Sequence, residues 1–179
     1  ICCVQFHIHT YLTLTVSKLS REKNNMFVWI LGIGAMLSLF ISHQKKSRNG
    51  ILAYKLCADV FWAAHYICLG AMAGAIPNFV GIFREIIFIN RGRRKFASST
   101  VWPCLFIATN LTLGIISFDG WYDVLPIVAS AFVTVSLWIK NPKLTKCISI
   151  PVSGAFLIYN IFVGSYIGIF AERSLSSPL

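Results

Sequence analysis

The chain has 179 residues, of which 56 % are hydrophobic and 12 % are charged, and its mean hydropathy is +0.71. A soluble domain of average composition has about 25 % charged residues, so this composition excludes an ordinary soluble protein and favours an all-α polytopic membrane bundle. The net charge of +10 does not indicate nucleic-acid binding, because the basic residues lie in short clusters between apolar segments and no basic aromatic platform is present.

Residues 1–25 differ from the rest of the chain. They contain no apolar segment long enough to span a membrane, and no basic region with a cleavage site that would be typical of a signal peptide. A disordered tail, or a non-native segment ahead of Met26, is the favoured interpretation. A metal site is the alternative, with candidate ligands Cys2, Cys3, His7 and His9.

Seven apolar segments follow, and most approach the ~20 residues that a helix needs to cross a membrane. We expect them to form one transmembrane domain over residues 26–179, with spans at 26–43, 51–69, 71–90, 100–118, 124–139, 147–164 and 166–179. The last segment is too short for a hydrocarbon core of ~30 Å. We therefore expect the natural chain to continue beyond Leu179.

The loops between these segments differ in charge. Basic residues follow the first, third and fifth spans, at Lys45, Lys46, Arg48, Arg91, Arg93, Arg94, Lys95, Lys140, Lys143 and Lys146. The loop at 119–123 carries Asp119 and Asp123 and no basic residue. The positive-inside rule then predicts cytoplasmic basic loops and a helical part that starts outside. The basic loops could also recognise anionic lipid head groups.

The hairpin at residues 51–90, which turns at Gly70, carries ionisable residues inside apolar sequence. Folded about its midpoint, it brings Asp59 level with Arg84 and His65 level with Asn78. Because ionisable groups are costly in hydrocarbon and usually find partners there, we expect Asp59 and Arg84 to form an ion pair or gate.

Other polar and aromatic side chains in this hairpin have open roles. His65 could relay protons or bind a solute, or it could be a structural histidine bonded to Asn78 or to a backbone carbonyl. Glu85 lies about 100° around the helix from Arg84, so we expect it to pair with a basic loop residue instead. Trp62 could line a pocket or pack in the core.

An internal repeat with an offset of 94 residues lies under this pattern. Gly70 and Gly164 are related by this offset, as are Gly74 and Gly168. It predicts two parallel three-helix repeats, residues 26–95 and 120–179, joined by a linker helix at 100–118. The repeat partners of His65 and Asn78 are Tyr159 and Glu172, and we expect these four residues to form a polar substrate site at the repeat interface.

Three segments resemble the YgjV family of bacterial inner-membrane proteins. They are AHYICLGAMAGAIPNFVGIFRE, VLPIVASAFVTVSLWIKNPKLTK and IYNIFVGSYIGIFAE, and the resemblance extends from about Met26 to the end of the chain. It implies a multi-pass protein of the bacterial inner membrane.

The layout is also similar to that of the SWEET and PQ-loop transporters, which carry sugars or amino acids between two three-helix bundles. In SWEET proteins an Asn on the third span and its partner on the seventh line the pocket. Asn78 matches the first of these positions, whereas Glu172 replaces the second Asn. The paired Pro-Gln signature is absent, since Pro126 has Gly32 as its counterpart.

No catalytic motif is present, and the six cysteines lack the spacing of a disulfide framework or a metal site. We therefore expect no enzyme activity, no cofactor and no nucleic-acid partner; the expected partners are the lipid bilayer, a small polar solute and a second copy of the chain. Two functions remain open. One is a small-solute transporter or facilitator, and the other is a membrane scaffold or assembly protein whose polar residues only hold helices together.

Overall fold

The computed structural model describes residues 26–139 and 141–176 of the chain. The expectations for residues 1–25, including the candidate metal ligands, lie outside the described residues. Within them the structure consists of α2 (Met26–Gln44), α3 (Arg48–Leu69), α4 (Met72–Ile89), η1 (Phe96–Ser98), α5 (Val101–Ile116), η2 (Trp121–Asp123), α6 (Val124–Trp138), α7 (Pro142–Val163) and α8 (Tyr166–Ser176).

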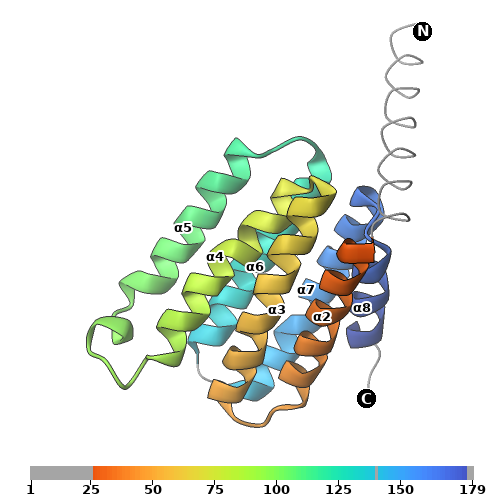
Figure 1. Ribbon diagram of the computed structural model, residues 1–179. Helices are drawn as coiled ribbons and strands as arrows, with labels where there is room; N and C mark the ends of the chain where they lie inside the picture. The colour runs from red at the N-terminus through yellow and green to blue at the C-terminus, as the bar shows by residue number, and fades with distance from the viewer. Residues whose placement is uncertain (1–25, 140, 177–179) are drawn as a thin grey trace, which may run out of the picture.

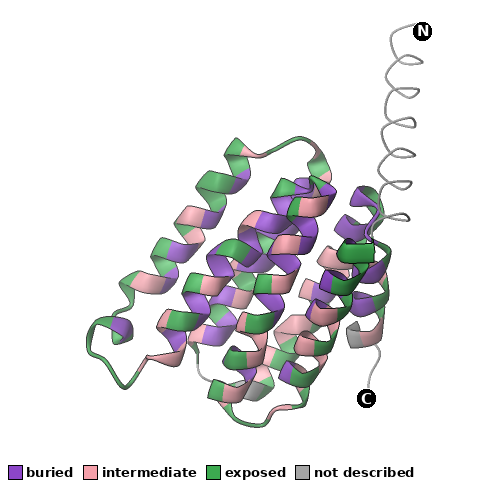
Figure 2. Ribbon diagram, in the orientation of Figure 1, coloured by how far each residue is buried: buried purple, intermediate pink, exposed green. Residues whose placement is uncertain are grey.

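The protein is a polytopic helical membrane bundle, as its composition predicts. Five of the described helical segments are long and apolar enough to cross a membrane, and α5 is a shorter apolar helix. Large hydrophobic side chains remain exposed along most helices, for example Ile115, Phe132 and Phe170. Figure 2 shows exposed positions along the helices of the bundle. Such exposure is unfavourable in water but is expected where a helix faces lipid chains.

Two helices begin earlier than the sequence pattern predicts. Helix α3 starts at Arg48, where Ser47 accepts a hydrogen bond from the Gly50 amide, and α7 starts at Pro142, where Asn141 accepts from the amides of Lys143 and Leu144. Ser and Asn are strong N-cap residues, and Pro is favoured in the first helical turn. Arg48, Lys143 and Lys146, which were expected in loops, therefore belong to membrane helices, whereas Lys45, Lys46 and residues 91–95 lie outside the α-helices.

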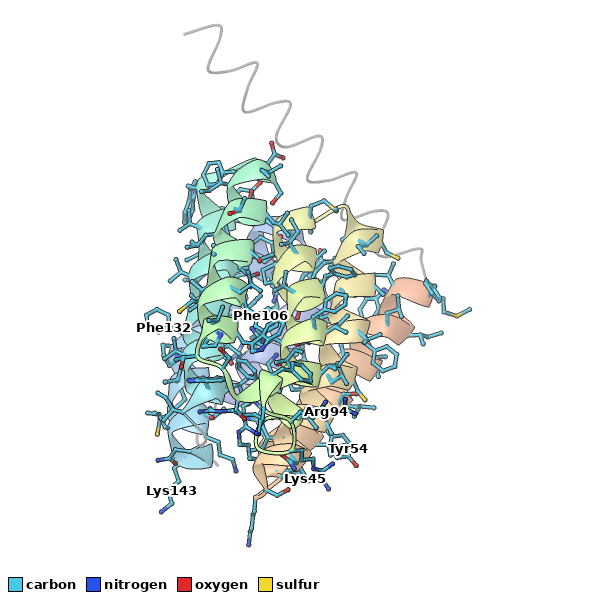
Figure 3. All side chains as sticks on the ribbon, turned by 90° about the vertical axis from the view of Figure 1, so that its left-hand side faces the viewer. Lys45, Tyr54, Arg94, Phe106, Phe132 and Lys143 are labelled. Atoms are coloured by element: carbon cyan, nitrogen blue, oxygen red, sulfur yellow. The ribbon has the colours of Figure 1, made fainter. Side chains whose placement is uncertain are left out.

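The helices alternate in direction through the bundle. In Figure 1, α2, α4, α6 and α8 run one way and α3, α5 and α7 run the other, with α5 at one edge beside α4. The labelled basic residues Lys45, Arg94 and Lys143 gather at one end of the molecule, as Figure 3 shows. Phe106 and Phe132 lie farther from that end.

The 94-residue offset relates the helix boundaries of the two halves. It superposes the limits of α3 on those of α7, and the start of α4 on the start of α8. Both middle helices end at a glycine in the left-handed conformation, Gly70 at φ 70° and Gly164 at φ 71°. We call residues 26–89 repeat 1 and residues 121–176 repeat 2.

The two repeats meet through equivalent helix pairs. Helix α2 packs on α8 and α4 packs on α6, and the repeat offset converts one pair into the other. Glycines permit close approach, since a Cβ on Gly32 would lie 2.8 Å from the Ile167 side chain. The interior between the two repeats is thus enclosed by helices of both, with α5 outside it (Figure 1).

Candidate functional site

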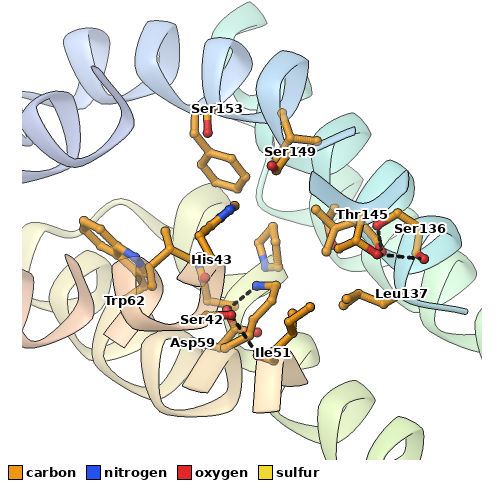
Figure 4. A pocket seen from close by; sticks show the side chains of 18 of the residues that line it. Ser42, His43, Ile51, Asp59, Trp62, Ser136, Leu137, Thr145, Ser149 and Ser153 are labelled. Carbon is orange, nitrogen blue, oxygen red and sulfur yellow. Dashed lines mark hydrogen bonds and ion pairs between the residues drawn. The ribbon is translucent and has the colours of Figure 1, made fainter. Parts of the chain in front are cut away.

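A cavity of about 100 Å³ lies between the two repeats. Its walls come from α2, α3, α4, α6, α7 and α8. The wall residues reach from the middle of the bundle, at Tyr66 and Asn78, to the end that carries the basic loops, at His43 and Lys146. Figure 4 shows Asp59 and Trp62 of α3 on one side and Ser149 and Ser153 of α7 on the other.

Most of the wall residues fall into pairs related by the repeat offset. These pairs are Leu39 with Val133, Ser42 with Ser136, His43 with Leu137, Ile51 with Thr145, Lys55 with Ser149, Asp59 with Ser153, Trp62 with Phe156, and Asn78 with Glu172. The cavity is therefore lined largely by residues at equivalent positions of the two halves. Substrate sites of repeat-built transporters occupy this position.

A cluster of four charged residues lies on the repeat 1 side of the cavity, with Lys55, Asp59 and Arg84 in its wall and Glu85 in contact with Lys55 and Arg84. Lys55 Nζ lies 2.7 Å from Asp59 Oδ1 and 3.9 Å from Glu85 Oε1. Arg84 Nη2 lies 2.9 Å from Glu85 Oε1 and 3.6 Å from Asp59 Oδ2. Two cations and two anions in contact balance one another, which is how buried charges are tolerated in hydrocarbon.

Helix α6 completes the surroundings of Arg84. The Arg84 Nη1 group donates to Thr134 Oγ1 at 3.0 Å and to Ser130 Oγ at 3.4 Å. Since α6 belongs to repeat 2, Arg84 connects the two repeats. Gly81 leaves room for this arrangement, because a Cβ there would lie 2.3 Å from Asp59 Oδ2.

The contacts of Asp59, Arg84 and Glu85 agree only in part with the sequence-based expectation. Arg84 does contact Asp59, but its shorter contact is with Glu85, and the closest partner of Asp59 is Lys55. The expectation that Glu85 pairs with a loop residue was wrong, because the long Arg84 side chain folds back to its neighbour. Sequence reasoning overlooked Lys55, although its position four residues before Asp59 is the spacing of a helical ion pair.

His65 lies in the core and not on the cavity wall. Its Nδ1 is 3.0 Å from the Val28 carbonyl oxygen, which can only accept, so this nitrogen carries a proton. Its Nε2 is 2.9 Å from Ser165 Oγ, which also accepts from the Gly168 amide at 3.2 Å. The Ser165 hydroxyl can therefore donate to Nε2. His65 joins α3 to α2 and to the α7–α8 turn. Of the two structural partners considered for it, His65 contacts a backbone carbonyl and not Asn78.

Tyr159, the repeat partner of His65, is likewise enclosed by the core. It is 0 % exposed, and its ring packs against Gly74, where a Cβ would lie only 2.7 Å away. Beside it, the Tyr66 hydroxyl donates to Asn160 Oδ1 at 2.8 Å, a bond between two positions 94 residues apart. These contacts close the bundle between the cavity and the turns at Gly70 and Gly164.

Asn78, Glu172 and Trp62 do line the cavity. Asn78 Nδ2 donates to the Gly74 carbonyl at 2.7 Å. Glu172 is 7 % exposed and has a side-chain hydrogen bond with Ser153 on the neighbouring helix α7. Trp62 stacks on Tyr66, with ring centroids 5.5 Å apart. The expected quartet thus divides into Asn78 and Glu172 at the cavity and His65 and Tyr159 outside it.

Comparison with known proteins places the chain in a family. The model of the Imp-YgjV family, described as bacterial inner membrane protein, matches residues 26–177. The chain belongs to this family. It is therefore a multi-pass protein of the bacterial inner membrane, as the YgjV resemblance implied. No curated protein and no solved structure matches it.

Two arginines join helix ends at the basic-loop end of this Imp-YgjV protein. Arg48 donates to the Phe88 carbonyl of α4 at 2.9 Å and to the Leu137 carbonyl of α6 at 3.3 Å. Arg91 donates to the Trp138 carbonyl and lies over the Trp138 ring, 3.4 Å from its centroid. Positive charge at a helix C-terminus is favourable, so both residues stabilise the contact between α4 and α6.

Metal ligation is not supported within the described part of this Imp-YgjV chain. Residues 26–139 and 141–176 contain no group of three or more His, Cys, Asp or Glu side chains that could hold a metal ion. The described cysteines are free thiols, with Cys57 and Cys68 on α3, Cys104 on α5 and Cys147 on α7. What the cavity offers is hydrogen bonding, charge and aromatic surface.

Proposed function

We propose that the protein transports or facilitates the passage of a small polar solute across the bacterial inner membrane. The observation that carries the proposal is the position of the cavity, whose walls are built from paired positions of the two repeats. Its volume of about 100 Å³ is below the 300–1,000 Å³ of pockets for drug-sized ligands, which suits a small solute. Enzyme activity and a nucleic-acid partner have no place in this proposal.

The layout supports a mechanism in which the repeats move relative to each other. The cavity reaches the basic-loop end, while the Tyr66–Asn160 and His65–Ser165 bonds close the opposite end. Three-plus-one-plus-three transporters of the SWEET and PQ-loop type expose a site at the repeat interface to one side at a time. In this chain, opening the end opposite the basic loops requires the Tyr66–Asn160 and His65–Ser165 bonds to break. The helix ends joined by Arg48 and Arg91 would move closer together at the same time.

Membrane orientation is part of the proposal. The basic loops face the cytoplasm, and the loop with Asp119 and Asp123 faces outward, because excess Lys and Arg is retained on the cytoplasmic side. A single cysteine at position 120 in a variant lacking the other cysteines tests this. An impermeant maleimide should label this cysteine from the periplasmic side. If labelling occurs only after the inner membrane is permeabilised, the orientation is the reverse of the proposed one.

Uptake into proteoliposomes, screened against a library of small metabolites, tests the transport itself. Ser153→Trp fills the cavity from α7 and should abolish uptake of any solute that the wild-type protein carries. Ile158→Trp is the matched control, because Ile158 lies on the same helix and is 43 % exposed on its surface. Melting temperatures of both variants establish that they fold.

The outcomes separate the two functional classes. Uptake that survives in Ile158→Trp and disappears in Ser153→Trp supports transport through the cavity. Uptake that survives in both variants means that the solute takes another route. If no solute enters faster than into protein-free liposomes, the transport proposal fails, and the scaffold interpretation, in which buried bonds such as Tyr66–Asn160 only hold helices together, takes its place.

A further inference from the structure

The cavity carries one more acidic group than its paired charges require. Lys55 and Arg84 match Asp59 and Glu85 in number and contact them directly. Glu172 lies on the repeat 2 side, is 7 % exposed, and forms no ion pair with any residue that the structure describes. Its hydrogen-bond partner is the neutral Ser153 hydroxyl.

The other cations of the cavity are engaged or distant. Lys55 attracts Glu172 electrostatically, but its ammonium group is bonded to Asp59 at 2.7 Å. Lys146 is exposed in the first turn of α7, and its backbone lies seven residues, or about 10 Å of helix, from Ser153. His43 lies at the same end, in the last turn of α2. Among the described residues, the inner cavity therefore holds one acidic group that has no cation in contact with it.

Aromatic rings stand at equivalent positions of the two repeats on the wall of the same cavity. Trp62 and Phe156 are repeat partners that both line the cavity, and Tyr66 stacks on Trp62. The faces of aromatic rings attract cations, and an ammonium ion can bind between such faces while a carboxylate balances its charge. Asn78, the repeat partner of Glu172, adds an amide to the same cavity.

Resting on the proposed transport function, we infer that the solute is a small alkylammonium ion, held with its cationic group at Glu172 and its alkyl groups between Trp62 and Phe156. Neutral and anionic solutes of the same size should bind more weakly, because they leave the buried carboxylate of Glu172 without a counterion. Repeat 1 supplies no equivalent acid on its third helix, since Asn78 occupies that position. The preference for a cation thus comes from the difference between the two repeats.

Binding to the purified full chain in detergent tests this with matched probes. Choline and 3,3-dimethylbutan-1-ol have the same shape but differ in charge, as do ethanolamine and propan-1-ol at a smaller size. Thermal-shift titrations at constant ionic strength should give a dissociation constant for at least one cation that is lower than that of its neutral match by about tenfold or more, as expected for a charge-assisted contact.

Three variants locate the effect. Glu172→Gln should remove the preference for the cation, whereas Asp119→Asn, which removes one exposed negative charge at the far end, should keep it. Phe156→Leu should weaken binding of the cation more than binding of the alcohol. If Glu172→Gln does not fold, Phe156→Leu carries the test alone, and an unchanged preference in that variant overturns the inference.

The remaining outcomes are equally informative. Equal affinity for cation and alcohol in the wild type, saturable binding of neither, or a preference that persists in Glu172→Gln would each overturn the inference. Cation binding without uptake into proteoliposomes would refute transport and leave the site standing. Uptake of a neutral or anionic solute that Glu172→Gln does not change would refute the alkylammonium site and leave transport standing.

Discussion

Repeat 1 places Lys55 and Asp59 on the cavity wall, whereas repeat 2 places Ser149 and Ser153 at the same positions of its own middle helix. The backbones of these helices correspond residue for residue and end at equivalent left-handed glycines. The local signals that set helix limits are therefore shared, while the side chains facing the cavity have diverged. The two halves thus have matching helix limits, whereas the ion-paired residues at the cavity come from repeat 1.

This difference has a physical basis. Helix ends are specified by one or two cap residues, so a repeat keeps its shape as long as Ser47 and Asn141, or Gly70 and Gly164, are present. A charged cluster needs all its members at once, because a buried charge without a partner is costly. Such a cluster is retained whole in one repeat or not at all.

Removing Arg84 should have the largest effect on stability. Arg84→Ala leaves Glu85 without its 2.9 Å partner and Asp59 with Lys55 alone. Loss of one member of a buried ion pair costs about 3–5 kcal/mol in soluble proteins. We expect a comparable loss in the free energy of unfolding in detergent, whereas Arg93→Ala in the exposed basic loop should change it by less than about 0.5 kcal/mol.

Double-mutant cycles then rank the partners of Arg84. The coupling energy between Arg84→Ala and Glu85→Gln should exceed the coupling between Arg84→Ala and Asp59→Asn, because the first contact is shorter. Strictly additive losses for both pairs would contradict the cluster. If Arg84→Ala lowers the free energy of unfolding no more than Arg93→Ala does, the burial of Arg84 is contradicted.

Gly81→Ala tests how tightly repeat 1 encloses its charges. A Cβ at this position would lie 2.3 Å from Asp59 Oδ2 and 3.1 Å from Arg84 Nη2, so Asp59 must move and its contacts weaken. Overpacking of this kind costs about 1–3 kcal/mol. The expected readout is a lower melting temperature in detergent.

Gly154 in repeat 2 provides the matched control. A Cβ there meets no heavy atom within 4 Å, and the residue lies in the interior of α7. Gly154→Ala should therefore raise the free energy of unfolding by up to about 1 kcal/mol, because Ala is the better helix former. Equal effects of the two substitutions would mean that Gly81 has no special packing role.

The sequence predicted the helical membrane bundle and the presence of buried charges because these depend on composition and spacing. It did not predict which side chains meet. His65 and Asn78 lie at similar depth, but depth does not specify direction around the helix, and successive residues are about 100° apart. His65 and its partner Tyr159 face the core, whereas Asn78 and Glu172 face the cavity.

Lys55 shows a second limit of sequence-based reasoning. A lysine near the end of an apolar segment is compatible with a side chain that extends to the membrane surface, so its sequence position does not indicate an inward contact. The inward direction follows from the packing of α3 on α4, which brings Lys55 near Glu85 as well as Asp59. Such a contact between helices is not encoded in the spacing within either one.

The bond between Tyr66 and Asn160 is the next test, because it connects equivalent positions of the two repeats at 2.8 Å. Tyr66→Phe leaves the buried Asn160 side-chain oxygen without this donor and should cost about 1–2 kcal/mol. A double-mutant cycle with Asn160→Ala in detergent measures the coupling. Additive losses would mean that the bond does not hold the repeats together.

The smallest expected effect comes from making one turn resemble the other. Ser165 begins α8, accepts a hydrogen bond from the Gly168 amide at 3.2 Å and contacts His65. Its repeat partner Ala71 begins α4 without a side-chain cap bond. Ala71→Ser supplies a hydroxyl for the equivalent Gly74 amide and should raise the free energy of unfolding by about 0.5–1 kcal/mol.

Ser165→Ala is the reverse change and should lower the free energy of unfolding by at least about 1 kcal/mol, because the cap and the His65 contact are lost together. The difference between the two magnitudes isolates the contribution of His65. Adding His65→Phe to each variant checks this: the cost of Ser165→Ala should shrink, while the gain from Ala71→Ser should persist. A gain from Ala71→Ser that required His65 would show that the two turns are coupled through the bundle and do not act as independent caps.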